Sequence, residues 1–407
     1  MIQRRLFICF LFVLVACKKE RPTSVTLNDD VTFLASDALK GRETGTESEL
    51  MAANYIQKRM QSMGLQPKGM AGTYFQTFTF KPKKDPHSEV HYGNGDSTIT
   101  GTNVIGFIDH KAENTIVIGA HYDHLGMGGE GSLHREGQAI HNGADDNASG
   151  VAVLLQLAEK LKQIPARHNY LFLAFSGEEM GLLGSNYFVK NPTINLSKVN
   201  CMLNMDMVGR LREDITLSIS GTGTATLWEQ IVQTTNPGFK LVLQQSGVGP
   251  SDHTSFYLQD IPVLHFFTGQ HEDYHKPSDD SEKLNYEGMQ LLTDYITAIL
   301  MEVDQAPKLA FRKTKNESEE VPRFKVGLGV VPDYLFDGKG MRIDGVSEDK
   351  PAQKAGLQKG DIVLQLGDSI VVNMMSYMRA LSAFKEGDKT KVIVDRNGSA
   401  LEVDIAF

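Results

Sequence analysis

The sequence predicts an α/β protein in which a mixed β-sheet is flanked by helices and is followed by a second, smaller domain. Apolar runs without alternation recur along the chain, and such runs are typical of strands that are covered on both faces. Segments with helical spacing of apolar residues lie among them. The chain has 407 residues, of which 41% are hydrophobic, and this length exceeds what one compact core usually holds, so two domains are expected.

The elements can be placed in order along the chain. Leu50, Ala53, Ile56 and Met60 have roughly helical spacing, and Gly64 follows as a stop signal. The remaining elements are assigned by the same criteria, from apolar spacing and from uninterrupted apolar runs. Helices are therefore expected at residues 47–63, 150–161 and 286–303, and strands at residues 103–108, 116–120, 170–175, 201–205, 215–220 and 261–267.

The chain begins with a cationic start and a short apolar core. Arg4 and Arg5 precede an apolar stretch over residues 6–15, which is too short to span a bilayer comfortably and has the order of parts of a secretory signal. The residues around Cys17 resemble a bacterial lipobox, so cleavage before Cys17 and its lipidation are expected, giving an exported, membrane-attached lipoprotein. An ordinary signal peptide cut elsewhere, or a membrane anchor, is the alternative. We expect the signal peptide at residues 1–16 and a polar tether at residues 17–27.

Composition and cysteine usage narrow the possible functions. The chain has 41 basic and 50 acidic residues, a net charge of −9, and no basic run long enough to follow phosphates, so we expect no nucleic-acid partner. If the signal is removed and Cys17 carries lipid, Cys201 is the single cysteine left, and a disulfide within one chain is excluded. Rigidity must then come from core packing and metal.

Five potential metal ligands stand where apolar runs stop. A buried strand that ends in a carboxylate or an imidazole needs a partner for that polar group, and several such endings can satisfy one another around a metal. Nitrogen and oxygen ligands together suit zinc better than magnesium or calcium, and two ions that share a carboxylate can hold a hydroxide between them. The five residues are His121, Asp146, Glu179, Asp206 and His275.

A general base that is not itself a ligand is expected beside these residues. Glu178 and Glu179 are adjacent, so their side chains point in different directions in an extended or turning backbone. One can bind metal while the other takes a proton from the water between the ions. The pair could also begin a helix, because acidic side chains favour a helix N-terminus and residues 181–185 start like one. Both interpretations can hold together.

In combination, these motifs resemble those of a known family. The order His-x-Asp, Asp-Asp-Asn-x-Ser-Gly, Glu-Glu, Asp and His, from His121 to His275, is similar to that of the co-catalytic zinc aminopeptidases of the aminopeptidase Y and bacterial leucyl aminopeptidase type, in peptidase clan MH. The resemblance covers roughly residues 28–305. It implies a zinc exopeptidase fold, two zinc ions, and hydrolysis of N-terminal residues from peptide substrates.

The resemblance also implies which residue holds which ion. Asp146, immediately before the Asn of its motif, would bridge the two ions. His121 and Asp206 would complete the site of one ion, and Glu179 and His275 would complete the site of the other. A hydroxide that bridges the ions would then attack the substrate carbonyl.

Three further roles follow from the resemblance. Glu178 would be the general base and acid that carries the proton to the leaving amine. Asp123, two residues after His121, would orient the imidazole from behind. Tyr274 occupies the position from which related enzymes donate a hydrogen bond to the oxyanion.

Other residues near the motifs have their own explanations. Asp145 is an alternative to Asp146, by one residue, as the bridging ligand. Ser251, Asp252 and His253 could suggest a serine triad, but no glycine elbow surrounds the serine and adjacent residues rarely point at each other. The remaining histidines are expected in the substrate pocket or behind the ligands (His124, His141, His253, His271) or at the surface (His87, His91, His110, His134).

The composition changes after the zinc aminopeptidase domain, expected at residues 28–305. Residues 306–323 are rich in Lys, Glu, Asn and Ser, which is typical of a linker. Residues 324–407 resemble a PDZ domain of bacterial arrangement, most specifically over residues 355–362. This resemblance implies that backbone amides receive the C-terminal carboxylate of a peptide ligand, which adds as an extra strand, although the module could only support the catalytic domain. The residues implied in that contact are Gly327, Leu328 and Gly329.

Three other functions stay open. A glutaminyl cyclase shares the fold but uses fewer of the ligands, so retention of all five argues against it. A carboxypeptidase of the same clan needs a cationic pocket, for which Arg210 is the nearby candidate. A peptide-binding protein, in which the PDZ domain acts on a silent peptidase scaffold, has no reason to keep Glu178.

Overall fold

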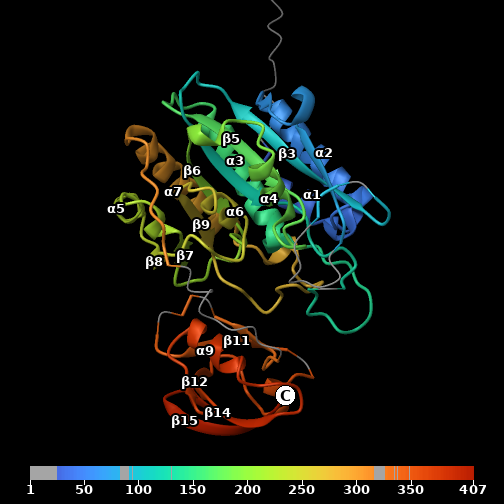
Figure 1. Cartoon of the computed structure of the whole chain (residues 1–407), viewed down its shortest axis with the longest axis vertical. Helices are drawn as coiled ribbons and strands as arrows, with labels where there is room; N and C mark the ends of the chain where they lie inside the picture. Colours follow the sequence, from blue (N-terminus) through green and yellow to red (C-terminus); the bar gives the residue numbers. More distant parts are fainter. Residues whose placement is uncertain are drawn as a thin grey trace, which may run out of the picture.

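The structure is a computed structural model, and it describes residues 25–82, 91–93, 95–129, 131–315, 326–333, 335–336, 338–347 and 349–407. Within these residues the chain forms a nine-stranded sheet and a separate six-stranded sheet. Figure 1 shows the two as an upper domain and a lower domain that ends at the C-terminus. The expected α/β fold class, with a second small domain, is confirmed. The expected signal peptide, Cys17 and His87 lie outside the described residues.

The large sheet is mixed. Its strand order is β1-β3-β5-β4-β6-β9-β7-β8, with β2 paired to β3. Strands β5, β4, β6 and β9 run parallel, and β3 and β7 flank them antiparallel, so the carboxyl ends of four central strands meet at one edge. The strands are β1 (Gln66–Pro67), β2 (Phe75–Phe80), β3 (Ile99–Ile108), β4 (Thr115–His121), β5 (Asn169–Phe175), β6 (Val199–Met205), β7 (Thr216–Ser220), β8 (Lys240–Gln244) and β9 (Val263–Phe267).

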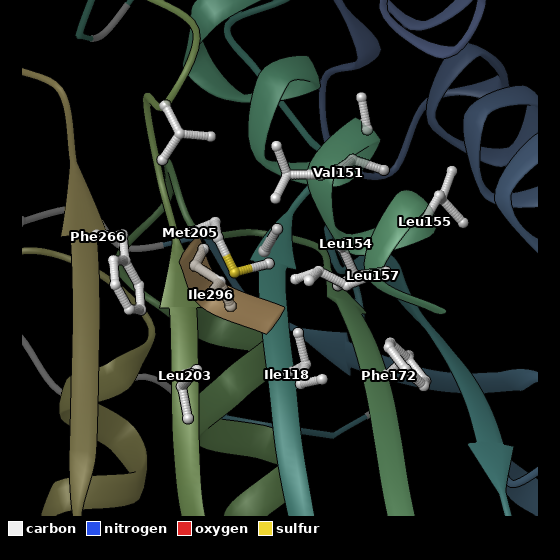
Figure 2. Close-up of a cluster of buried hydrophobic side chains, with 14 of the residues drawn as sticks. Ile118, Val151, Leu154, Leu155, Leu157, Phe172, Leu203, Met205, Phe266 and Ile296 are labelled. Carbon is white, nitrogen blue, oxygen red and sulfur yellow. The ribbon is translucent and has the colours of Figure 1, made fainter. Parts of the chain in front are cut away.

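The central strands are buried on both faces, as their uninterrupted apolar runs predict. On one face, Ile118, Phe172 and Leu203 pack against Leu154 of α3 (Gly150–Leu161) and Ile296 of α7 (Tyr286–Gln305), as Figure 2 shows. The other face packs against α4 (Leu183–Lys190) and α6 (His253–Tyr257). Each of these side chains stabilises the fold by about 1.5–3 kcal/mol through burial, so the ends of the central strands form a rigid platform.

The helices begin at recognisable caps. Thr46 accepts a hydrogen bond from the N–H of Glu49 at the start of α2 (Glu47–Ser62), and Asn285 accepts one from Gly288 at the start of α7. Helix α3 follows directly from a π-type turn, η3 (Ala144–Ser149). The expected helices and strands are found, with ends displaced by a few residues. The other helical elements are α1 (Leu27–Leu34), α5 (Trp228–Thr234), η1 (Asp37–Arg42), η2 (Met70–Gly72), η4 (Leu196–Lys198), η5 (Thr222–Thr224) and η6 (Ser281–Lys283).

The chain after α7 stays on the large domain instead of leaving it. Leu309 is buried, and its N–H donates to Asn200 Oδ1 at 2.8 Å. Phe311 pairs with Ala225 as an isolated β-bridge. The first part of the linker expected at residues 306–323 therefore packs on the large domain, because apolar side chains anchor this stretch despite its polar composition.

The small domain has its own core. Leu328, Ile343, Val363 and Val392 belong to one buried cluster. Among the described helices of the whole chain, none is both long and apolar enough to cross a membrane. The elements of the small domain are β10 (Val330–Pro332), β11 (Met341–Val346), α8 (Pro351–Lys354), β12 (Ile362–Leu366), β13 (Ser369–Ile370), α9 (Met374–Leu381), β14 (Lys389–Arg396) and β15 (Ser399–Ala406).

Arg212 of the large domain holds the small domain. Its Nη1 lies 3.3 Å from Asp333 Oδ2, and its Nη2 lies 3.1 Å from Asp344 Oδ2. Arg342 also donates to Asp333, through Nε at 2.7 Å. Burial opposes the charge on Asp333, but the hydrogen bonds from Arg212 and Arg342 outweigh it and hold the pKa of this carboxyl below its usual value. One carboxylate is thus shared by guanidinium groups of both domains.

Arg212→Gln is expected to weaken the contact between the domains by about 1–3 kcal/mol, since a buried carboxylate loses a charged donor. Small-angle X-ray scattering of the full chain should give a larger radius of gyration, whereas Arg167→Gln, at an exposed position, should not. Acid should act in the same direction. The folded pKa of Asp333 is depressed, so its contribution is complete above the unfolded pKa of about 3.9 and is lost as the pH falls through the folded value. An unchanged radius in Arg212→Gln would mean that other contacts hold the domains.

Candidate active site

The expected ligands converge at the carboxyl edge of the four parallel strands. His121 is the last residue of β4, and Asp206 directly follows β6. Glu179 lies just beyond the end of β5, and His275 lies in the loop that follows β9. Asp146 is part of turn η3 between β4 and α3. Five segments that are far apart in the sequence are therefore brought together, as expected from the rule that sites in open α/β sheets lie at carboxyl ends.

Asp146 stands between two histidines. Its Oδ1 lies 3.3 Å from Nε2 of His121, and its Oδ2 lies 3.2 Å from Nε2 of His275. His121 Nε2 also lies 3.3 Å from Asp206 Oδ1, and His275 Nε2 lies 3.4 Å from Glu179 Oε2. The arrangement is a pair of ligand sets that share one carboxylate.

These spacings fit bound metal ions. Two ligand atoms that are each ~2.0–2.1 Å from a tetrahedral ion lie about 3.3–3.4 Å apart, which matches the distances above. The outer ring nitrogens are also occupied: Nδ1 of His275 is 2.8 Å from the carbonyl oxygen of Gly131, and Nδ1 of His121 is 3.2 Å from that of Asp123. If each Nδ1 donates, each Nε2 presents a lone pair to carboxylates. Only a cation or a proton can occupy such a position favourably.

The charges in the site lead to the same conclusion. Burial lowers the pKa of His275, but the carboxylates of Glu179 and Asp146 outweigh it and raise that pKa to about 9. For Asp146, burial is opposed by hydrogen bonds from His121 and His275, and its pKa is held well below the usual value. Carboxylates packed this closely need positive charge between them, and zinc supplies it at any pH at which the ligands are deprotonated.

Glu178 is placed beside the ligand sets without standing between the histidines. Its Oε2 is 4.0 Å from Nε2 of His121, close enough to form a possible ligand group with His121 and Asp206. Burial raises the pKa of Glu178 well above its usual value; His121 opposes this rise, and the carboxylates of Asp206 and Asp252 add to it. A largely buried carboxyl group with a raised pKa beside a metal site is typical of a general base.

Asp123 is found behind the site, but its contacts differ from the expected ones. Its Oδ1 is 3.7 Å from Nδ1 of His121, too far for a hydrogen bond, and the nearer acceptor for the ring is the main-chain carbonyl of Asp123 itself. The carboxylate instead accepts the N–H of Glu178 at 3.2 Å and the hydroxyl of Thr44 at 3.0 Å. Asp123 therefore fixes the turn that carries Glu178 more directly than it fixes the imidazole.

The carboxylates of Asp145 and Asp146 contact different partners. Asp145 Oδ1 accepts the N–H of Gly209 at 2.6 Å, and its Oδ2 lies 3.1 Å from Nε2 of His271. This carboxylate is thus used inside the protein, and His271 is its partner. Asp146 is the member of the pair that faces both histidines.

Tyr274 contacts one of the expected ligands, whereas Arg210 lies away from the pocket beside them. The Tyr274 ring stacks on His275, with ring centroids 3.8 Å apart and planes inclined by 22°. Arg210 donates to Asp273 at 3.2 Å and lines a cavity of about 660 Å³ between the domains, away from the pocket that borders the ligands. The expected surface histidines are exposed at His91 and partly buried at His110 and His134.

No serine triad forms among the described residues. Ser251 Oγ accepts a hydrogen bond from Asn204 at 2.8 Å. His253 is buried and stacks on His265, with centroids 4.5 Å apart and planes inclined by 7°. Burial lowers the pKa of His253 well below its usual value, so this ring is a neutral part of the core.

Two supporting residues were missed by sequence reasoning. Asp279 Oδ2 accepts the N–H groups of Asp145 and Asp146 at 3.0 and 3.1 Å. Arg42, fully buried, donates to the carbonyl groups of Tyr122, at 2.8 Å, and of residues 142 and 143. Neither residue ends an apolar run or belongs to a spaced motif, so nothing in the sequence pattern distinguishes them.

A pocket of about 400 Å³ borders the ligands. Much of its wall is apolar, and its polar members include Glu43, Lys81 and Glu179. The pocket opens beside the carboxylates, so it is the natural place for the part of a substrate next to the reacting bond. The apolar lining consists of Phe80, Pro82, Ile99, Leu125, Met180 and Leu183.

In the small domain, the expected carboxylate-binding segment is an irregular stretch just before β10. Leu328 is buried in the core, and its carbonyl accepts the N–H of Ala352. Gly329 has a φ of 74°, and a Cβ there would meet the Lys350 side chain, so this position needs glycine. Gly327, the third expected residue, precedes them in the same irregular segment.

The large domain has the fold of zinc aminopeptidases. A zinc aminopeptidase from Bacillus subtilis superposes with a TM-score of 0.55 at 18% identity, covering 72% of this chain and 98% of that one. A glutaminyl cyclase from Porphyromonas gingivalis superposes with a TM-score of 0.54, also at 18% identity, over 68% of this chain and 97% of that one. At these identities the likeness establishes the fold, which both kinds of enzyme share.

The sequence comparisons are more specific. Residues 103–300 match peptidase family M28, and residues 310–407 match the PDZ domain. The chain therefore contains an M28 peptidase domain followed by a PDZ domain, as its motifs predict. Aminopeptidase YwaD of Bacillus subtilis is 29% identical over 241 residues, which is 54% of this chain and 50% of that protein. The chain spans about half the length of the curated relatives it matches.

Proposed function

We propose that the protein is a two-zinc aminopeptidase that removes N-terminal residues from peptides. The observation that carries this proposal is the position of Asp146, whose two oxygens face different histidines. His121 and Asp206 would hold one ion, and Glu179 and His275 would hold the other. A carboxylate shared between two ligand sets is the arrangement that two-metal hydrolases require.

The other catalytic roles are assigned to particular residues of the chain. Bound zinc would polarise the substrate carbonyl and lower the pKa of a water molecule. Glu178 removes the proton of that water and returns it to the leaving amine; its buried position and raised pKa support this role. Asp123 fixes the backbone of Glu178. Tyr274 is proposed to donate a hydrogen bond to the oxyanion, from its place against His275.

The pocket beside the ligands supports a preference at the N-terminal residue. Its apolar walls suit a large apolar side chain. Three acidic residues, Glu43, Asp123 and Glu179, line the pocket against one basic residue, Lys81, so carboxylates outnumber cations there even though burial raises the pKa of Glu43. Cationic side chains are therefore acceptable, and acidic ones are disfavoured.

Aminoacyl nitroanilides test the activity and the preference together. We expect kcat/KM for leucyl and arginyl substrates to exceed that for the aspartyl substrate by about 10-fold or more. Glu43→Gln should reduce the difference between arginyl and aspartyl substrates and leave the leucyl rate nearly unchanged. Peptides with an acetylated N-terminus should not be cut. Equal cleavage of free and acetylated peptides would end the aminopeptidase proposal.

The three rival functions predict other outcomes. A glutaminyl cyclase would convert N-terminal glutaminyl peptides to cyclic products without releasing an amino acid. A carboxypeptidase would remove residues from acetylated peptides, but Arg210 is engaged by Asp273 away from the pocket, which disfavours this function. A protein whose peptidase domain is inactive would show neither reaction. The full chain would still bind peptides, through residues 306–407.

We also propose that the protein is exported and attached to a membrane through lipid on Cys17. Metabolic labelling with a fatty-acid analogue should mark the wild-type protein and not Cys17→Ser.

The PDZ domain is proposed to bind peptide C-termini through Gly327, Leu328 and Gly329. This binding would supply substrates or partners to the catalytic domain.

A further inference from the structure

An additional imidazole lies in the site, and none of the roles above uses it. His124 follows β4 by three residues and is 1% exposed. Its ring and that of His275 form an edge-to-face contact, with centroids 5.8 Å apart and planes inclined by 71°. Ligand atoms of His124, Asp146 and Glu179 all lie within 4.8 Å of one another, so they form a group that could hold a metal ion.

The contact between His124 and Glu179 is close but is not a hydrogen bond. Nδ1 of His124 lies 2.7 Å from Oε1 of Glu179, yet both atoms remain without a hydrogen-bond partner, because the ring nitrogen is not directed at the oxygen. Nε2 of His124 is also buried and without such a partner. A buried imidazole with both nitrogens unsatisfied beside an unsatisfied carboxylate oxygen is unfavourable unless a further group joins them.

Two other buried histidines of the described chain can be compared with His124. His141 bonds to Ser132 at 2.7 Å and to the carbonyl of Ala139 at 2.9 Å. His253 is also without hydrogen-bond partners, but it stacks on another imidazole, and no ion pair with a carboxylate is found for it among the described residues. His124 alone combines unsatisfied nitrogens with a close carboxylate of the ligand set.

The backbone is shaped to admit this ring. Gly143, which precedes turn η3, has a φ of 56°, and a Cβ there would lie 2.5 Å from Cγ and Cδ2 of His124. The same turn carries Asp146, so the glycine that frees the imidazole also positions the shared carboxylate.

We propose that His124 is an additional ligand of the ion that Glu179 and His275 hold. That ion would have two imidazoles and the other only His121. The two sites are then unequal in affinity, and the ion beside Asp206 keeps more of its coordination open to substrate. This inference rests on the proposed metal centre, but it concerns metal binding and does not require peptidase activity.

Metal titration of the full-length protein tests the inference. Cobalt(II) added to the metal-free protein gives visible absorption that reports coordination, and competition with a chelator gives each zinc affinity. We expect His124→Asn to weaken one equivalent of zinc by at least about 10–100-fold and to change the absorption of one cobalt equivalent. His141→Asn, which removes a buried imidazole from the same loop, should bind both equivalents as the wild type does. Wild-type affinities and spectrum in His124→Asn would overturn the inference.

A second measurement is independent of the folding of the variant. X-ray absorption at the zinc edge of the wild type should give three imidazoles for every two ions, and a value of two would overturn the inference. If the wild type binds a single ion, the two-metal proposal fails, whereas the role of His124 is still decided by whether His124→Asn weakens that ion. If the wild type binds none, both fail. Absence of peptidase activity with normal metal binding would contradict only the proposed function.

Discussion

Glu178→Gln is expected to lower kcat for a leucyl nitroanilide by about 10²–10⁴-fold, the usual contribution of a general base. The amide has nearly the shape of the carboxylate but cannot accept the proton, so KM should change little. The N–H of residue 178 would still donate to Asp123, so the turn should keep its conformation. Steady-state kinetics with the zinc-loaded protein measure both constants.

Glu179→Gln is the matched comparison, because the two residues are adjacent and only Glu179 faces His275. This variant should lose zinc, whereas Glu178→Gln should keep two equivalents. Full activity in Glu178→Gln would end the assignment of the base. Loss of zinc from Glu178→Gln would instead make Glu178 a ligand beside His121 and Asp206, which its position also allows.

Most of the large fold is predictable because the central strands are buried on both faces. Short uninterrupted apolar runs such as residues 170–175 are typical of strands in the middle of a sheet. Short or partly exposed edge strands lack this signal: β8 is exposed at Lys240 and Gln244, and β1 is two residues long. The packing of residues 306–315 on the large domain could not be predicted from their polar composition, because it depends on two apolar side chains, Leu309 and Phe311.

The residues of the candidate site also differ in how far the sequence predicts their positions. His121 and Asp206 could be found because they end strands, and the parallel topology brings strand ends together. His124 could be expected near the ligands, but the direction of its ring could not be predicted, since this depends on how the loop turns after β4 and on the space left by Gly143. The contacts of Asp123 were also beyond prediction, because the backbone of Glu178 competes with the His121 ring for the same carboxylate.

Arg42 is the residue that sequence reasoning could least anticipate, and it joins the two loops that carry His121 and Asp146. Its guanidinium donates to the carbonyl of Tyr122 next to His121, and to those of Asn142 and Gly143 before turn η3. A further donation, to Leu34, ties both loops to α1. Burial lowers the pKa of Arg42 to about 10, opposed by surrounding carboxylates, so the group stays charged at neutral pH.

Arg42→Met is expected to lower the free energy of unfolding by about 3–5 kcal/mol, the range found when one partner of a buried charged network is removed. Four buried carbonyl groups would lose their donor, and the carboxylates of the site would lose a permanent cation. Zinc affinity should fall as well, because the loops bearing His121 and Asp146 would no longer be held together. Urea unfolding of the metal-free protein and chelator competition measure the two effects.

Arg59→Met separates a general loss of stability from an effect on the site. Arg59 is also buried and pairs with Asp30 at 2.7 Å, and its guanidinium donates to both oxygens of that carboxylate, away from the ligand loops. This variant should unfold more easily but bind zinc with wild-type affinity in the folded state. Arg42→Lys should recover part of the lost zinc affinity, because it keeps the charge, but not the stability, since an ammonium cannot reproduce the planar fork that reaches four carbonyls. If Arg42→Met and Arg59→Met changed zinc affinity equally, Arg42 would act on the fold alone.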